Sequence, residues 1–255
     1  MIRAHQAKIN WQRLLPAQRS AAIFVLRRAI PFAMPFKDME AYRLCTWRHG
    51  SLPRIPITEI FPGIEKVDVS MRNIYNRTVG TSVDAEEILD ICAIERFIKA
   101  TRILEIGTFD GNTALNLAAN TPGTVTTVDL PDDWNGELKY DVPKDYINVT
   151  NPAKVGMQYR GSPEEQRITQ VLADSAKLDW RNLGGQFDLI FVDGCHHYDY
   201  VKQDTENALA HLKNGGVLIW HDYGMIKDVS KVVDEVAKKI PVAIIRGTRL
   251  AVARK

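Results

Sequence analysis

Residues 103–119 read ILEIGTFDGNTALNLAA, and this stretch indicates how the rest of the chain folds. Its apolar start, Ile103–Gly107, predicts a buried strand, and Asn112–Ala119 predicts a helix. Gly107 and Gly111 lie at the turn, where glycine lets the backbone approach a ligand and the helix start offers free N–H groups. The turn lacks the G-x-G-x-x-G fingerprint of dinucleotide-binding sheets. The stretch therefore predicts a strand–turn–helix unit with a ligand site at its turn.

The same alternation of strand and helix continues toward the C-terminus. Apolar stripes at helical spacing predict helices that begin near residues 83, 198 and 229. Strict alternation of strands and helices implies parallel strands with helices on both faces of the sheet. We therefore predict a Rossmann-like, doubly wound α/β fold with a mostly parallel, seven-stranded sheet and a C-terminal β-hairpin. Beyond the first strand, the predicted strands are 124–130, 168–173, 187–193, 217–221, 242–245 and 250–253.

The N-terminal part of the chain differs in charge from the rest. The whole chain carries a net charge of +2, whereas residues 1–60 hold ten Lys and Arg against three acids. We divide the chain into a basic, helical and irregular extension (1–80) and the sheet domain (81–255). The long connection 131–165 predicts a lid or substrate wall.

The composition also bounds the setting of the protein. The net charge is too small to indicate nucleic acid, and the three cysteines lie far apart, as is typical of a reduced, cytoplasmic protein. The apolar stretch 21–36 is too short and too charged to span a bilayer, and no cleavable signal is visible. We expect it to pack in a homo-oligomer, with a peripheral membrane contact as the alternative.

Polar residues follow the predicted strands at the positions where each strand ends. In doubly wound sheets, ligands bind outside the carboxyl ends of the strands. Asp129 ends the second strand, 22 residues after Gly107, where a carboxylate accepts ribose hydroxyls. An adenosine-containing ligand is therefore expected, but the spacing does not choose between NAD and S-adenosylmethionine. The other strand-end groups are Glu105, Asp174-Ser175, the run Asp193–Tyr198 and His221-Asp222.

Several of these segments resemble one family in order and in position. The sequence resembles the class I S-adenosylmethionine-dependent methyltransferases over about residues 78–255. The most similar branch has an Asp-Gly-x-His-x-Tyr signature and includes O-methyltransferases of sugars and natural products. The segments that carry the resemblance are EIGTFDG (105–111), VDL (128–130), ADS (173–175), FVDGCHHY (191–198) and GGVLIWHDY (215–223).

The resemblance implies a role for each matching residue in cofactor binding. The amino acid end of S-adenosylmethionine would be held by the loop after the first strand, and the ribose hydroxyls by Asp129. The adenine would border Asp174 and Ser175, while Asp193 would lie near the sulfonium. The segment 78–81 would close over the cofactor. The loop residues implied for the amino acid end are Glu105, Gly107, Thr108, Phe109 and Gly111.

The resemblance also implies how the chemistry works. His196 occupies the position of a general base that takes the proton from a hydroxyl of a small acceptor, a sugar or a secondary metabolite. Asp193, His221 and Asp222 match the layout of a divalent metal site, for Mg²⁺ or another cation. Histidine suits Mn²⁺, Fe²⁺ or Zn²⁺ better than Mg²⁺. The alternative is that His221 and Asp222 form a hydrogen-bonded pair that shapes the substrate pocket.

Two other functions stay open from the sequence. His196, His221 and a carboxylate could form the facial triad of a mononuclear iron oxygenase. A non-catalytic scaffold that binds S-adenosylmethionine, with the basic arm recruiting partners, is the non-enzymatic alternative. Substitution of His196 discriminates between them, because a scaffold does not need a base.

Overall fold

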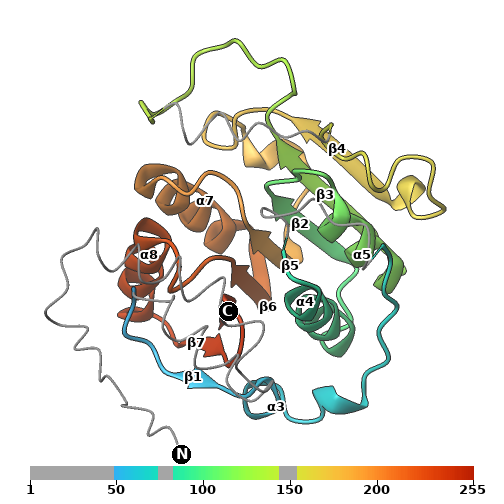
Figure 1. Ribbon diagram of the computed structural model, residues 1–255, viewed down its shortest axis with the longest axis vertical. Coiled ribbons are helices and arrows are strands. Elements are labelled where there is room, and N and C mark those ends of the chain that lie inside the picture. Colours follow the sequence, from blue (N-terminus) through green and yellow to red (C-terminus); the bar gives the residue numbers. More distant parts are fainter. Residues whose placement is uncertain (1–48, 74–82, 144–153) are drawn as a thin grey trace, which may run out of the picture. The chain divides into compact units, whose positions relative to one another are not determined.

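The computed structural model describes residues 49–73, 83–143 and 154–255. They form an eight-stranded sheet with the order β1-β7-β8-β6-β5-β2-β3-β4 (Figure 1). Neighbouring strands are parallel except at β8, which is antiparallel to β6 and β7. The predicted doubly wound fold and its C-terminal hairpin are therefore confirmed. The strands are β1 (Arg54–Ile55), β2 (Arg102–Ile106), β3 (Thr124–Asp129), β4 (Ile168–Leu172), β5 (Phe187–Val192), β6 (Leu212–Trp220), β7 (Val242–Ile245) and β8 (Ala251–Arg254).

Helices cover both faces of this sheet. Helices α4 (Ala85–Phe97) and α5 (Asn112–Asn120) lie on one face, and α7 (Tyr198–His211) and α8 (Lys227–Ala237) lie on the other (Figure 1). Successive side chains of a strand point to opposite faces. In β2, for example, Ile103 packs in the core under α4, while Leu104 packs in the core under α7 and α8. In the parts of the chain that the structure describes, no helix is long and apolar enough to cross a membrane.

The eighth strand, β1, was not predicted. The sequence between residues 40 and 80 indicated loops, whereas Arg54 and Ile55 pair in parallel with Ile244 and Ile245 of β7. A short helix, α3 (Ile57–Ile60), and a 3-10 turn, Ile64–Lys66, follow. A two-residue strand is too short to show a hydrophobic period, so the expected number of seven strands was wrong by one edge strand.

The described part of the expected N-terminal extension packs on the sheet domain. Phe61 and Ile64 are buried in the core under α4, and the described residues from 49 onward belong to one compact unit. The apolar stretch 21–36 and the expected cofactor-closing segment 78–81 lie outside the described residues. The expectations of an oligomer interface and of a membrane contact therefore stay predictions.

Helix α4 begins two residues after its expected start near residue 83. Its N-cap is Asp84, which forms a capping box with Glu87. Each side chain of a capping box accepts a hydrogen bond from a backbone N–H of the other residue. The capping box fixes the orientation of the buried Glu87 side chain in the first turn of α4.

The order of the strands reverses next to β2. The chain runs outward from β2 through β3 to β4, and then returns to place β5 on the other side of β2. Such a switch point opens a crevice at the carboxyl ends of the two central strands, where doubly wound sheets bind their ligands. The loops after β2 and β5 flank this point.

Candidate functional site

The loop after β2 lies directly against the loop after β5. Gly107 has φ +97°, and a Cβ atom at this position would lie 2.1 Å from the carbonyl oxygen of Asp193. A side chain at residue 107 would force the two loops apart, so glycine is required here. Phe109 also has a left-handed backbone, with φ +49°. Residues that are not glycine seldom adopt this conformation, and such strain is concentrated at functional sites.

Asp129 supports this loop from the end of β3. Its Oδ2 accepts hydrogen bonds from the backbone N–H groups of Thr108 and Phe109, at 2.9 and 2.8 Å, and its Oδ1 accepts one from Leu130. Burial raises the pKa of Asp129, although these N–H groups oppose the shift. A carboxylate has about four acceptor positions, so one remains for a further donor.

Glu105 and Asp174 are more enclosed than the sequence suggested. Glu105 is 1% exposed and accepts a hydrogen bond from the Thr127 hydroxyl, and burial raises the pKa of Glu105 well above its usual value. Asp174 is 4% exposed and accepts bonds from Lys139 N, Tyr200 Oη and Ala176 N. Glu105 therefore lies beneath the loop, where it binds Thr127 of the neighbouring strand β3. The carboxylate of Asp174 has one acceptor position left.

Two segments of the connection between β3 and β4 border the site. Gln158 N donates to the Asp110 carbonyl, and Gly156 N donates to the Phe109 carbonyl. Lys139 holds Asp174, as described above. The expected lid or substrate wall stays a prediction, and residues 144–153 of the same connection lie outside the described part.

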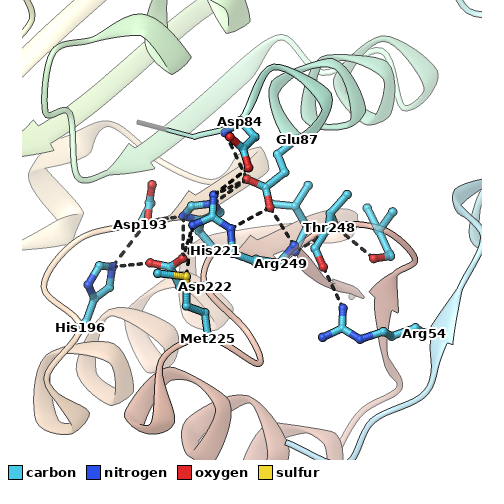
Figure 2. A network of polar contacts seen from close by, with 12 residues as sticks. Arg54, Asp84, Glu87, Asp193, His196, His221, Asp222, Met225, Thr248 and Arg249 are labelled. Atoms are coloured by element: carbon cyan, nitrogen blue, oxygen red, sulfur yellow. Dashed lines mark hydrogen bonds and ion pairs between the residues drawn. The ribbon is translucent and has the colours of Figure 1, made fainter. Parts of the chain in front are cut away.

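Asp193, His196 and Asp222 come together at the ends of β5 and β6. His196 Nε2 lies 3.2 Å from Asp222 Oδ2 and 3.7 Å from Asp193 Oδ1 (Figure 2). The His196 side chain is 36% exposed, but Nε2 itself is buried and makes no hydrogen bond of good geometry. Burial lowers the pKa of His196, but the adjacent carboxylates outweigh this effect and raise it above its usual value. The two carboxylates thus orient the imidazole of His196, part of which is exposed to solvent.

Asp222 has a left-handed backbone, with φ +60°. Its carbonyl accepts hydrogen bonds from the N–H groups of Met225 and Ile226, which turn the chain into α8. This turn directs the Asp222 carboxylate back toward His196 rather than into solvent (Figure 2). Asn and Asp tolerate this conformation better than other side chains.

His221 lies behind this cluster, between two carboxylates. Nδ1 lies 2.9 Å from Asp193 Oδ1, and Nε2 lies 3.0 Å from Glu87 Oε2. Burial lowers the pKa of His221, but the surrounding carboxylates raise it well above its usual value. A histidine binds a metal through a ring nitrogen that carries a free lone pair. Both ring nitrogens of His221 contact carboxylates, and its expected hydrogen-bonded partner Asp222 lies 3.6 Å away, so the roles of His221 as a metal ligand and as a pair with Asp222 both stay predictions.

The remaining three residues fit a divalent cation. Asp193, His196 and Asp222 each offer one ligand atom, and these atoms lie within 4.8 Å of one another. Two carboxylates and one imidazole suit Mn²⁺, Fe²⁺ or Zn²⁺ better than Mg²⁺. By this geometry, the candidate metal ligands are Asp193, Asp222 and His196.

The sequence did not single out Glu87 and Arg249 as site residues. Glu87 looked like one of several acids at the start of a helix, which stabilise its N-terminus. Arg249 stands just before the last apolar strand, and this position was the available signal. Arg249 Nη1 lies 2.8 Å from Asp222 Oδ1, so both residues belong to the polar network in Figure 2.

Comparison with known proteins relates this site to one family. Residues 104–223 match a protein-family model described as a methyltransferase domain. No curated protein sequence matches the chain significantly. The matched segment runs from β2 to the residue after Asp222 and contains every predicted site residue.

Solved structures share the fold at low sequence identity. The chain is 17% identical to a methyltransferase of Podospora anserina solved with S-adenosylhomocysteine (SAH), with a TM-score of 0.53, and the match covers 87% of this chain and 97% of that one. It is 14% identical to an O-methyltransferase of Bacillus cereus, also solved with SAH, with a TM-score of 0.50 and coverages of 91% and 97%.

Proposed function

Because residues 104–223 match the methyltransferase-domain family, we propose that this chain transfers a methyl group from S-adenosylmethionine to a hydroxyl of a small molecule. The acceptor is a sugar or secondary-metabolite hydroxyl, a choice that rests on the Asp-Gly-x-His-x-Tyr resemblance. His196 is the general base, and Asp193 and Asp222 orient it.

The observation that carries this proposal is the place of His196 at the switch point. Nε2 faces Asp222 and Asp193, while other atoms of the ring are exposed. When the proton sits on Nε2, next to the carboxylates, Nδ1 keeps a lone pair for a substrate hydroxyl. The backbone contact between Gly107 and Asp193 brings the base next to the loop proposed to bind the cofactor.

Each group of the site has a task in the proposed reaction. When bound, S-adenosylmethionine supplies an electrophilic methyl group on a sulfonium. The loop after β2 and Asp129 would hold the amino acid and ribose parts, which would fix the position of the methyl group. As the new O–CH₃ bond forms and the C–S bond breaks, the sulfur keeps the electron pair and His196 takes the hydroxyl proton. The products are the methyl ether and SAH.

A divalent cation at Asp193, His196 and Asp222 is the second candidate. This candidate is supported by the short distances between their ligand atoms, which all lie within 4.8 Å of one another. Such a cation would bind the acceptor hydroxyl and lower its pKa. His196 Nε2 would then be a ligand, so the two candidates differ in the role of one ring.

The first test is calorimetric titration of the protein with SAH, with and without EDTA, and with NAD as the control ligand. We expect one SAH per chain and no binding of NAD. An effect of EDTA favours the metal candidate. Absence of SAH binding in both buffers would refute the methyltransferase proposal.

The second test is His196→Ala. We expect kcat to fall by about 10²–10⁴-fold, the usual contribution of a general base, while SAH affinity stays similar. The matched control is His211→Ala, at the other end of α7. Wild-type turnover in His196→Ala would exclude the base and favour the scaffold. Activity that requires oxygen and stops in chelator would favour the iron oxygenase.

A further inference from the structure

Glu87 and Arg249 form an ion pair next to the site, outside the family-matched segment. Glu87 lies in the first turn of α4, and Arg249 lies between β7 and β8. Arg249 Nη2 donates to Glu87 Oε2 at 2.7 Å, and Arg249 Nε donates to Oε1 at 3.1 Å. The backbone N–H of Arg249 also donates to Oε1, at 2.7 Å. This two-pronged geometry is specific to a guanidinium and fixes both side chains.

Each member of the pair also reaches one carboxylate of the site. Arg249 Nη1 donates to Asp222 Oδ1 at 2.8 Å, which leaves Oδ2 facing His196. Glu87 Oε2 contacts Nε2 of His221, and the other nitrogen of His221 contacts Asp193 Oδ1. Figure 2 shows the pair reaching Asp222 directly and Asp193 through His221.

Because these side chains are buried, loss of one contact is expected to disturb the others. The side chains of Glu87 and Arg249 are 3% and 13% exposed, and that of Asp222 is 8% exposed. Removing one partner of a buried ion pair leaves the other charge uncompensated, so the remaining groups rearrange. Burial lowers the pKa of Arg249, but Glu87 and Asp222 outweigh this effect and raise it, so the guanidinium stays charged. Arg249 is the fixed cation between Glu87 and Asp222.

We propose that Arg249 and Glu87 are positioning residues for the methyl transfer, holding Asp222 and Asp193 in place against His196. This inference rests on the proposed function, because it assigns these residues to the same site. Neither residue touches the reacting atoms in this scheme. Arg249 acts on Asp222 directly, and Glu87 acts on Asp193 through His221. Small displacements of a catalytic group reduce the rate strongly, by about 10²-fold for about 1 Å.

The test compares Arg249→Lys and Glu87→Gln with the control Arg254→Met, all in the full chain. Lysine keeps the charge of Arg249, but its single ammonium cannot span Glu87 and Asp222 as the guanidinium does. Glutamine keeps the shape of Glu87 and removes its charge. Arg254 is exposed at the end of the same hairpin.

The first readout needs no acceptor substrate. The ring ¹H–¹⁵N signals of the six histidines are recorded at one fixed pH with EDTA, and His196→Ala assigns the His196 signals. We expect Arg249→Lys and Glu87→Gln to move the His196 signals by more than Arg254→Met does. His196 signals that coincide with those of the wild type in both variants would overturn the proposal, because the pair would then be purely structural.

SAH affinity and thermal unfolding are measured on the same proteins. SAH affinity within about twofold of the wild type, with cooperative unfolding, shows that the fold and the cofactor loop are intact. If Arg249→Lys does not fold, Glu87→Gln carries the test. Absence of SAH binding in the wild type would refute the proposed function, a result that is independent of the histidine spectra. With an acceptor in hand, kcat should fall by about 10²-fold while KM for S-adenosylmethionine stays unchanged.

Discussion

At the scale of single residues, Asp129 both holds the loop after β2 and keeps one acceptor position of its carboxylate vacant. Three backbone N–H groups, those of Thr108, Phe109 and Leu130, already bind its carboxylate. These three hydrogen bonds fix the backbone of the loop at the end of β3. A hydroxyl bound at the remaining position adds a hydrogen bond to a charged group, which contributes about 1.5–3 kcal/mol.

We expect Asp129→Asn to bind SAH about 10- to 100-fold more weakly than the wild type, because the charged acceptor is lost. Titration calorimetry measures the change. The exposed Asp133, four residues along, provides the control Asp133→Asn. Equal SAH affinity of Asp129→Asn and the wild type would show that Asp129 does not bind the ribose.

At the scale of elements, α5 holds the chain segment that precedes α4. Asn120 Oδ1 accepts from Ser70 N and its Nδ2 donates to Ser70 O, each at 2.8 Å. Asn116 makes the same pair of bonds with the backbone of Arg72, at 2.7 and 3.1 Å. The two side-chain amides thus act like the backbone of a neighbouring strand. Both side chains are buried, so their loss leaves backbone groups without a partner.

Asn120→Ala should therefore lower the free energy of unfolding by about 1–3 kcal/mol. Urea denaturation measures this loss, and amide hydrogen exchange at Ser70 should accelerate because its N–H loses its acceptor. The control is Asn214→Ala at an exposed position of β6. Unchanged exchange at Ser70 in Asn120→Ala would contradict the clamp.

At the scale of the whole molecule, the interior contains carboxyl groups that make no hydrogen bond of good geometry with the described residues. Both oxygens of Asp204 on α7 are such atoms, and the residue is 1% exposed. Burial raises the pKa of Asp204 to about 7. Glu95 on α4 is also buried without such a hydrogen bond, and burial raises its pKa to about 9. The folded protein binds these two protons more tightly than the unfolded chain does.

The contribution of Asp204 and Glu95 to stability should therefore fall as the pH rises. For Asp204, the contribution is complete below pH 3.8, the usual pKa, and is lost as the pH rises through about 7. The Asp204→Asn variant cannot ionise at this position and so does not lose this stability. Its free energy of unfolding at pH 8 should exceed that of the wild type by up to about 4 kcal/mol. The difference should shrink toward pH 4.

Urea denaturation at pH 5 and pH 8 tests this sign, with Glu206→Gln at an exposed position of α7 as the control. A gain for Asp204→Asn that is the same at both pH values would contradict the assigned titration. Glu95→Gln should show the same trend relative to the wild type. In the wild type, the stability lost through ionisation of Glu95 should continue to grow until the pH reaches about 9.

Much of the fold and several site positions follow from local patterns. The strand–turn–helix around Gly107, the alternation of strands and helices, and the strand-end acids depend on neighbours within a few residues, so the sequence displays them directly. The resemblance of residues 105–223 to a methyltransferase family is likewise confirmed by the family match. His196 and Asp193 lie together because they are three positions apart on one loop.

The sequence by itself thus determined the doubly wound sheet, the glycine turn and the strand ends at which the polar residues of the candidate site lie. The tertiary structure alone decided which polar groups meet there. Glu87 and Arg249 are 162 residues apart, and their pairing depends on how α4 and the C-terminal hairpin pack on the sheet. The same packing places carboxylates at both nitrogens of His221 and leaves His196 facing the site. The physical reason is that a side chain's partners are set by the distances between elements, which no local pattern contains.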